Sequence, residues 1–324
     1  MIQAARWCLR TRAGRTVALC LSLLGGVFLF VGGPDSTSPR SFQRLWDSGH
    51  IVLFFLWASL LTLTIKQRPG VKRHRLVVSL VLFSICLGAG IELIQVMIGR
   101  TFSWGDVMRD VIGTLLAVAV FLRKTGEGRD VPLVMAWILI GVCLMVEFTA
   151  FARVASDEVL ASLQFPVLSN FETPFEADRW GKNSLGRSRD VSKNGDHSLK
   201  VRLLTTPYSG VGLTYFPEDW RGFKWLTMGL YKQSPGELEL HVRVHDAIHT
   251  RTGNRFRDRY NETFTVHQGW NDITVETNRI RKAPADREMD MKHIQGLGIF
   301  AMNLDDEEVI YIDDVALTGR APVR

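Results

Sequence analysis

The chain has 324 residues, enough for two domains, and its composition changes sharply near Arg153. Residues 1–153 contain long apolar runs and 17 of the 39 Lys and Arg against 8 of the 33 acids, so this part carries +9 and the remainder −3. The basic isoelectric point is typical of a nucleic-acid-binding protein. The positive charge, however, lies between hydrophobic segments and not on a soluble face, and this location excludes that class of protein. The four cysteines, all in or next to apolar segments, predict neither a disulfide framework nor a zinc site.

Five apolar segments follow one another in the first part of the chain. They cover residues 16–31, 51–65, 76–98, 107–122 and 131–151. Most approach the ~20 residues that a helix needs to cross a hydrocarbon core of about 30 Å. The sequence therefore predicts an α-helical membrane bundle of about five transmembrane helices over residues 1–153. A cleaved signal peptide is the alternative for the first segment, because basic residues precede it and Gly32 and Gly33 follow it.

Basic residues between these segments predict the orientation, because cytoplasmic loops retain Lys and Arg. Twelve lie on one side, namely Arg6, Arg10, Arg12, Arg15, Lys66, Arg68, Lys72, Arg73, Arg75, Arg123, Lys124 and Arg129. The other side has Arg40, Arg44, Arg100 and Arg153. We expect a multi-pass protein of the bacterial inner (cytoplasmic) membrane, with a cytoplasmic N-terminus and, after five crossings, an extracytoplasmic C-terminal domain.

Polar residues interrupt the apolar segments on the side predicted to face outward. The candidates for a site there are His50, Glu92, Gln95, Arg100, Asp106 and Asp110. Glu92 and Gln95 are spaced i, i+3 on one helix, and Asp106 and Asp110 are spaced i, i+4 on another, so each pair can face one place. An ionisable group at membrane depth costs about 2.5–3.5 kcal/mol on insertion scales, so it usually has a partner.

Three interpretations of this cluster remain open. The residues could form ion pairs and hydrogen bonds that lock the helices together. They could instead line a polar pocket at the outer leaflet, in which Arg100 and His50 meet an anionic head group and the carboxylates orient them or move protons. Snorkelling to the interface is the third interpretation.

The same residues resemble the VanZ-like family, which is named for a teicoplanin-resistance protein. The resemblance covers roughly residues 50–122 and rests on Gly49-His50, Glu92-x-x-Gln95, Arg100-x-x-Ser103-x-x-Asp106 and Gly113. The chain departs from the family in having Asp47-Ser48-Gly49 before the histidine, where Asp-Lys is frequent, and Asp110 where Asn is usual. The resemblance implies an integral membrane protein of the cell envelope and does not supply a reaction.

Residues 169–324 show the period-two alternation of β-strands, after a linker at 154–168. The clearest segments include HSLKVRLL, KWLTMGLY, LELHVRVHD and VIYIDDVAL, with turn-rich stretches such as KNGD between strands. About nine strands without an intervening helix predict an all-β, antiparallel sandwich of the jelly-roll type.

This part resembles the galactose-binding-like carbohydrate-binding modules, through NFE at 170–172, the SLKV strand, Trp220, Trp225, GWN at 269–271 and YIDDV at 311–315. In many such modules two acids hold a structural calcium ion, and the matching positions are Glu172 and Asp313. Oxygen ligands suit calcium. The alternative is that these two acids simply end strands.

The segment LELHVRVHD carries the clearest candidate binding face. Alternation predicts Leu240, Val242 and Val244 in the core and His241, Arg243 and His245 on the other face, near a run of arginines at 251–259. This face could bind a glycan, above all an acidic one, through charge-assisted hydrogen bonds, or it could be a solvated surface.

Exposed aromatic side chains would strengthen the glycan interpretation by stacking on sugar rings. The candidates are Tyr208, Tyr215 and Trp220, whereas Trp225 and Trp270 are expected to fill the core. No catalytic motif is recognisable in this domain, which we interpret as a binding or spacer module.

Together these features predict a membrane protein that recognises or handles an envelope polysaccharide or a lipid-linked sugar, with membrane lipid as a further partner. An enzyme or transporter acting on a lipid-phosphate substrate, through His50, Glu92, Arg100 and Asp106, is the alternative. A scaffold in exopolysaccharide or envelope assembly is another alternative.

Overall fold

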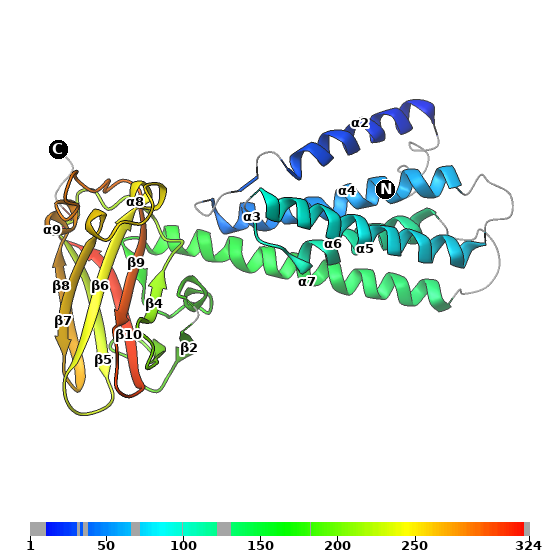
Figure 1. The fold of residues 1–324 in the computed structure, drawn as a ribbon. Coiled ribbons are helices and arrows are strands. Elements are labelled where there is room, and N and C mark those ends of the chain that lie inside the picture. The colour runs from blue at the N-terminus through cyan, green and yellow to red at the C-terminus, as the bar shows by residue number, and fades with distance from the viewer. Residues whose placement is uncertain are drawn as a thin grey trace. The chain divides into compact units, whose positions relative to one another are not determined.

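The structure, a computed structural model, describes residues 11–30, 33–34, 38–65, 72–98, 100–121, 131–181 and 183–320. The chain divides into two compact units, Met1–Ala152 and Arg153–Arg324, and one helix continues from the first unit into the second (Figure 1). The basic residues at positions 6 and 10, in the 66–71 loop and in the 122–130 loop lie outside the described residues. The predicted orientation therefore stays a prediction.

The first unit is helical, and each of the five apolar segments forms a helix. The helices are α2 (Arg12–Phe28), α3 (Arg40–Asp47), α4 (Gly49–Ile65), α5 (Arg73–Met97), α6 (Trp104–Phe121) and α7 (Val131–Gln164). Among the described residues only three helical stretches are long and apolar enough to cross a membrane, namely Arg40–Ile65, His74–Met97 and Val134–Gln164. The prediction of five transmembrane helices is therefore wrong.

The two remaining helices differ from candidate spans for separate reasons. Helix α2 has 17 described residues, which is short for a crossing. Helix α6 has 18 residues but includes three charged side chains, Asp106, Arg109 and Asp110, and most of its length is buried against its neighbours. The apolar segment predicted at 107–122 starts after Asp106, and its many apolar residues hide the two charges inside it, Arg109 and Asp110.

Two glycines allow α6 to approach its neighbours closely. A Cβ on Gly113 would collide with the backbone of α4 at Ile51, and a Cβ on Gly88 of α5 would collide with the carboxylate of Asp110. Small residues at such positions let membrane helices pack backbone to backbone. This packing places the polar ends of α4, α5 and α6 beside one another.

The second unit is an antiparallel β-sandwich, as predicted. Its strands are β1 (Val167–Ser169), β2 (Ser184–Ser188), β3 (Ser198–Leu203), β4 (Ser209–Leu213), β5 (Trp225–Lys232), β6 (Leu238–Asp246), β7 (Tyr260–Val266), β8 (Gly269–Glu276), β9 (Ile294–Ala301) and β10 (Glu308–Thr318). One sheet has the order β2-β3-β10-β5-β8, with β1 paired to β10, and the other has the order β4-β9-β6-β7 (Figure 1). Alternate residues of both sheets fill one apolar core between them.

Short helical turns interrupt the sandwich where none was expected. They are η1 (Glu176–Arg179), α8 (Ala247–Arg251), η2 (Phe256–Asp258) and α9 (Thr277–Arg281). Helix α8 directly continues β6, and the Asp246 side chain caps it by accepting a hydrogen bond from the His249 N–H at 2.9 Å. This cap turns the chain back over the end of β6.

Residues 154–168, expected to be a linker, instead form the end of α7 and the start of β1. From Val142 to Gln164 the sequence contains no Gly or Pro, so nothing ends the helix before the residues preceding Pro166. The apolar pattern ends near Phe151, and for that reason the sequence predicts the end of the span there.

Candidate functional site

The first candidate site is a polar layer at one end of the helical unit, where α4 and α6 begin and α5 ends. His50 of α4 and Asp110 of α6 are both buried, and the His50 Nδ1 lies 2.9 Å from the Asp110 Oδ1. Glu92 of α5 accepts a hydrogen bond from the Ser103 N–H at 2.7 Å. One ligand atom each from His50, Glu92 and Asp106 lie within 4.8 Å of one another. The structure thus brings together four of the six residues expected in this pocket.

The other two expected residues, Gln95 and Arg100, contact the end of α2. The Gln95 Nε2 donates to the Leu29 carbonyl oxygen at 2.8 Å, and the Arg100 Nη1 donates to the same oxygen at 3.2 Å. A carbonyl at a helix C-terminus has no partner within its own helix. Both side chains therefore join α2 to the polar layer.

The polar layer also contains Arg109 and Glu147, which are not among the six residues expected there from the sequence. The buried Arg109 guanidinium contacts Asp106 at 2.6 Å, Glu147 of α7 at 3.2 Å and Asp47 of α3 at 3.9 Å. The i, i+3 spacing of Asp106 and Arg109 was a usable signal. The contact with Glu147 joins residues 38 positions apart, which no local pattern predicts.

The second candidate site is the outer face of the four-stranded sheet β4-β9-β6-β7. The predicted alternation of β6 is confirmed, since Leu240, Val242 and Val244 are fully buried in the core. His241, Arg243 and His245 lie on the opposite face, and all three are partly buried there. We call these three residues the β6 row.

Strand β9 explains why the β6 row is partly buried. Its outward positions next to the row are Phe300, Gly298 and Gly296, which pair with His241, Arg243 and His245 in that order. The His241 ring stacks on Phe300 at a centroid distance of 5.2 Å. A Cβ on Gly296 would collide with the His245 ring, and one on Gly298 would lie 3.3 Å from the Arg243 Nε. The side chains of the row therefore lie across the glycines of β9.

Several nitrogens around the β6 row are buried without a hydrogen-bond partner in the described part of the chain. They are the Arg243 Nε, the His245 Nδ1, the His249 Nδ1 and the Arg259 Nε. Neither Arg243 nor Arg259 forms an ion pair or hydrogen bond with any described residue. Burial and the neighbouring Arg259 lower the pKa of Arg243, and burial together with Arg243, His249 and Arg259 lowers the pKa of His245 to about 4. The Arg243 and Arg259 Nε–H groups are buried donors, and such donors cost about 1–3 kcal/mol each when they stay unpaired, so this face favours an anion.

The low pKa of His245 gives a prediction for stability against pH. A histidine in the unfolded chain has a pKa near 6.5, whereas His245 in the folded chain has a pKa of about 4. Between these two pH values the unfolded chain therefore binds a proton that the folded chain does not bind. Between pH 7 and pH 4 the wild type should lose about 2 kcal/mol relative to His245→Gln, after allowance for partial exposure. Unfolding free energies of both proteins at several pH values measure this difference, and a difference that does not change with pH would contradict it.

The aromatic residues expected to stack on sugars differ in their exposure. Tyr208 is 68% exposed and its ring lies 6.2 Å from that of Phe300, so it borders the β6 row. Tyr215 is partly exposed, beyond the opposite end of β4. The assignment of Trp220 to a binding surface is wrong, because its side chain is fully buried and packs against Phe216 at 5.6 Å in the core.

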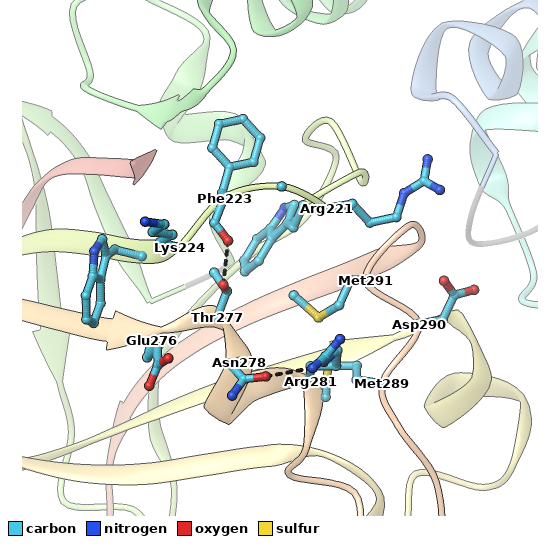
Figure 2. A pocket seen from close by; sticks show the side chains of 13 residues that line it. Arg221, Phe223, Lys224, Glu276, Thr277, Asn278, Arg281, Met289, Asp290 and Met291 are labelled. Carbon is cyan, nitrogen blue, oxygen red and sulfur yellow. Dashed lines mark hydrogen bonds between the residues drawn. The ribbon is translucent and has the colours of Figure 1, made fainter. Parts of the chain in front are cut away.

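The expectation that Trp225 fills the core is also wrong, because it is 41% exposed at the start of β5. It borders a pocket of about 720 Å³ at one end of the sandwich, which is lined by Arg221, Lys224 and Arg281 among others (Figure 2). The Thr277 hydroxyl donates to the Phe223 carbonyl oxygen at 2.6 Å and closes one wall of this pocket. Arg221 is neutralised by Asp219 at 2.7 Å, in contrast to the unpaired arginines near the β6 row.

The outer face of the other sheet is covered at its aromatic row. Trp270, Tyr231 and Tyr311 are cross-strand neighbours with ring centroids 5.4 and 5.8 Å apart. Tyr311 is buried, and its hydroxyl donates to Asp190 at 3.1 Å, in the segment that crosses over this face. The β6 row is therefore the better candidate for a ligand.

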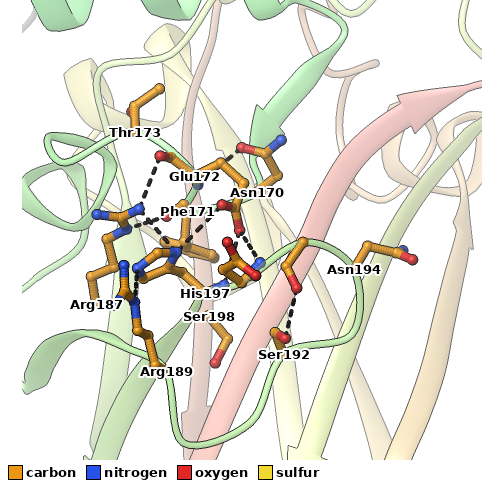
Figure 3. Close-up of polar contacts among 12 residues, drawn as sticks. Asn170, Phe171, Glu172, Thr173, Arg187, Arg189, Ser192, Asn194, His197 and Ser198 are labelled. Atoms are coloured by element: carbon orange, nitrogen blue, oxygen red, sulfur yellow. Dashed lines mark hydrogen bonds and ion pairs between the residues drawn. The ribbon is translucent and has the colours of Figure 1, made fainter.

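The two acids expected to hold calcium both accept hydrogen bonds from the loop before β3. Glu172 accepts the N–H groups of Asp196 and His197, each at 2.9 Å (Figure 3). Asp313 accepts the Lys193 N–H at 2.8 Å, and its burial raises its pKa to about 6. Backbone donors thus take the place that a cation would have at these oxygens. The predicted calcium ion itself stays a prediction.

Glu172, Asp196 and His197 also form a group whose ligand atoms lie within 4.8 Å of one another. Arg187 and Arg189 contact the His197 ring nitrogens, each at 2.9 Å (Figure 3). Two guanidinium groups on the histidine disfavour a cation there. This group is therefore better interpreted as a hydrogen-bonded anchor for the loop before β3.

The helical unit matches a known family model. Residues 16–125, about one third of the chain, match the model described as VanZ/LLP1. These residues form a VanZ-like domain. The match agrees with the resemblance noted in the sequence and, with the apolar helices, indicates a membrane protein. Among curated proteins no significant match was found.

Solved structures similar to the chain include carbohydrate-binding modules. A family 11 module from Clostridium thermocellum, in complex with a β-1,3-1,4-mixed-linked tetrasaccharide, has 16% identity and a TM-score of 0.35 over 48% of this chain and 95% of its own. An exo-β-agarase has 14% identity and a TM-score of 0.38, over 48% of this chain and 25% of its own. The chain therefore spans only a quarter of the agarase, and no ligand follows from either likeness.

Proposed function

We propose that this protein recognises an acidic glycan of the bacterial cell envelope, on a polysaccharide or on a lipid-linked sugar, through the outer face of the sheet β4-β9-β6-β7. The observation that carries the proposal is the group of buried nitrogens on Arg243, His245 and Arg259 that have neither a hydrogen bond nor an ion pair in the described part of the chain. No acid neutralises Arg243 or Arg259 in the described part of the chain.

The chemistry of the face suits a carboxylated or sulfated sugar. Arginine binds such groups through two parallel, charge-assisted hydrogen bonds, which are about twice as strong as neutral ones. The His241–Phe300 stack and the exposed Tyr208 supply aromatic surface next to these donors, and sugar rings pack against such surfaces. One anionic group and one ring face would thus meet matching partners.

The VanZ-like domain supplies the membrane part of the proposal. Its polar layer would contact a lipid head group at a membrane surface, with the N-terminus in the cytoplasm and the sandwich outside it. The basic residues of the tail, Arg6, Arg10, Arg12 and Arg15, favour a cytoplasmic N-terminus, and three crossings would put the sandwich on the opposite side. A reporter fused after Arg324 that is active only in the cytoplasm would overturn it.

A panel of oligosaccharides tests the proposed ligand. The full chain, purified in detergent, is titrated with acidic oligosaccharides, their neutral counterparts and lipid-linked sugars of the same composition. We expect binding to the acidic oligosaccharides. Comparison with the lipid-linked sugars shows whether the ligand is a polysaccharide or a lipid-linked sugar. Binding confined to neutral sugars, or to none, would refute the proposal.

A further inference from the structure

The polar layer of the VanZ-like domain contains a set of side chains that glycan recognition does not use. His50 lies in the first turn of α4, Glu92 in the last two turns of α5 and Asp106 in the first turn of α6. One ligand atom of each falls within 4.8 Å of the others. Atoms bound to one zinc-sized ion at about 2.0–2.2 Å lie roughly 3–4 Å apart, so small inward movements would place all three on a common ion.

His50 is oriented for such a role. Its Nδ1 lies 2.9 Å from the Asp110 Oδ1, which makes this nitrogen the donor and leaves the lone pair of Nε2 available. A carboxylate that accepts the second N–H of a histidine is the usual support of a metal-binding imidazole. Gly88 provides the space in α5 that the Asp110 carboxylate needs.

The carboxylates provide a second, independent observation. Glu92 is 1% exposed, and its Oε1 is buried with no hydrogen-bond partner in the described part of the chain, although its Oε2 accepts the Ser103 N–H. Asp106 uses its Oδ1 to accept from Arg109, which leaves its other oxygen for a further contact. A bound cation would satisfy the Glu92 oxygen that the protein leaves unpaired.

The charges of the polar layer also favour a cation, because acids outnumber basic residues there. In the described part of the chain, its acids are Asp47, Glu92, Asp106, Asp110 and Glu147, and the arginines with which interactions of these acids are recorded are Arg44, Arg100 and Arg109. Among the described residues of the layer, five acids therefore face three arginines. A divalent cation would offset the remaining two charges.

We propose that the His50 Nε2, the Glu92 Oε1 and an Asp106 oxygen bind one divalent transition-metal ion, with Asp110 as the residue that positions His50. One imidazole and two carboxylates suit Zn²⁺, Mn²⁺ or Fe²⁺, whereas Ca²⁺ prefers six or more oxygens. Three protein ligands leave a coordination position open for water or for an oxygen of a ligand. This site does not depend on glycan binding by the sandwich.

Metal content of the intact protein tests the site. The full chain in detergent is stripped with a chelator, dialysed against Zn²⁺ or Mn²⁺ alone, and analysed by elemental mass spectrometry. We expect one ion per chain, and loss of that ion in His50→Ala and in Glu92→Gln. When it is loaded with Co²⁺ as a spectroscopic probe, Asp110→Asn should give the absorption spectrum of an intact set of ligands. Its affinity for the metal should be about 10- to 100-fold lower than that of the wild type.

Glu147→Gln is the matched control, because it removes one carboxylate of the same layer outside the three ligands. It should bind one ion like the wild type. Added metal should raise the thermal midpoint of the wild type and of Glu147→Gln but not of Glu92→Gln, which separates lost binding from lost folding. Absence of a bound ion in the wild type, or equal losses in Glu147→Gln and Glu92→Gln, would overturn the proposal.

Discussion

Replacement of Asp157 by alanine should lower the free energy of unfolding of the β-sandwich by about 3–5 kcal/mol. Asp157 lies near the end of α7 and pairs with Arg179 of η1, with N–O distances of 3.0 and 2.5 Å. The two side chains are 2% and 0% exposed. Arg179 also donates to the Leu168 carbonyl oxygen at 3.1 Å, so the pair joins the helix to the start of β1. Without Asp157, the guanidinium would stay buried and uncompensated.

The neighbouring pair of Arg153 and Asp178 provides the control for this prediction. Its side chains are 52% and 46% exposed, and exposed ion pairs contribute less than about 1 kcal/mol. Hydrogen exchange of the sandwich strands in the full chain measures both variants, because the slowest amides report global unfolding of the unit. A loss below about 1 kcal/mol for Asp157→Ala would contradict the structural role of the pair.

Replacement of Arg243 by alanine should weaken binding of an acidic oligosaccharide by about 2 kcal/mol, or roughly thirtyfold. Arg243 lies at the centre of the β6 row, and its guanidinium has neither an ion pair nor a hydrogen bond among the described residues. Since it forms no such contact in the free protein, its removal should leave the stability of the sandwich unchanged or slightly higher. The affinity for the oligosaccharide would then fall without a fall in stability.

Arg221→Ala is the matched control for Arg243→Ala. Arg221 is an exposed arginine of the same unit that pairs with Asp219, and it lines the end pocket shown in Figure 2. The variant should bind the oligosaccharide as the wild type does. Equal losses in the two variants would indicate non-specific attraction, and a loss only in Arg221→Ala would move the ligand to the end pocket.

The sandwich illustrates what strand alternation can predict. The outward placement of His241, Arg243 and His245 followed from period two alone, since a residue between two core positions must face the other side. The same rule applied to KWLTMGLY would have placed Trp225 outside, because Leu226 and Met228 are in the core. Trp220 lies in a loop without periodicity, so its burial depends on tertiary packing that the sequence does not encode locally.

The helical unit shows how far the sequence can predict the contacts of charged residues. The family resemblance and helical spacing selected His50, Glu92, Asp106 and Asp110, which the structure brings together. Which residues pair could not be predicted, because the contact of His50 with Asp110 joins positions 60 residues apart. Pairs of this kind are set by how closely α4, α5 and α6 pack.

The most direct test of glycan recognition is a calorimetric titration of the full chain with two oligosaccharides that differ only in carrying uronic acids or their carboxyl-reduced, neutral counterparts. Two charge-assisted hydrogen bonds to one carboxylate should make the acidic compound bind at least about tenfold more tightly. Equal affinities for the two compounds would contradict the assignment of Arg243, His245 and Arg259 to an acidic glycan.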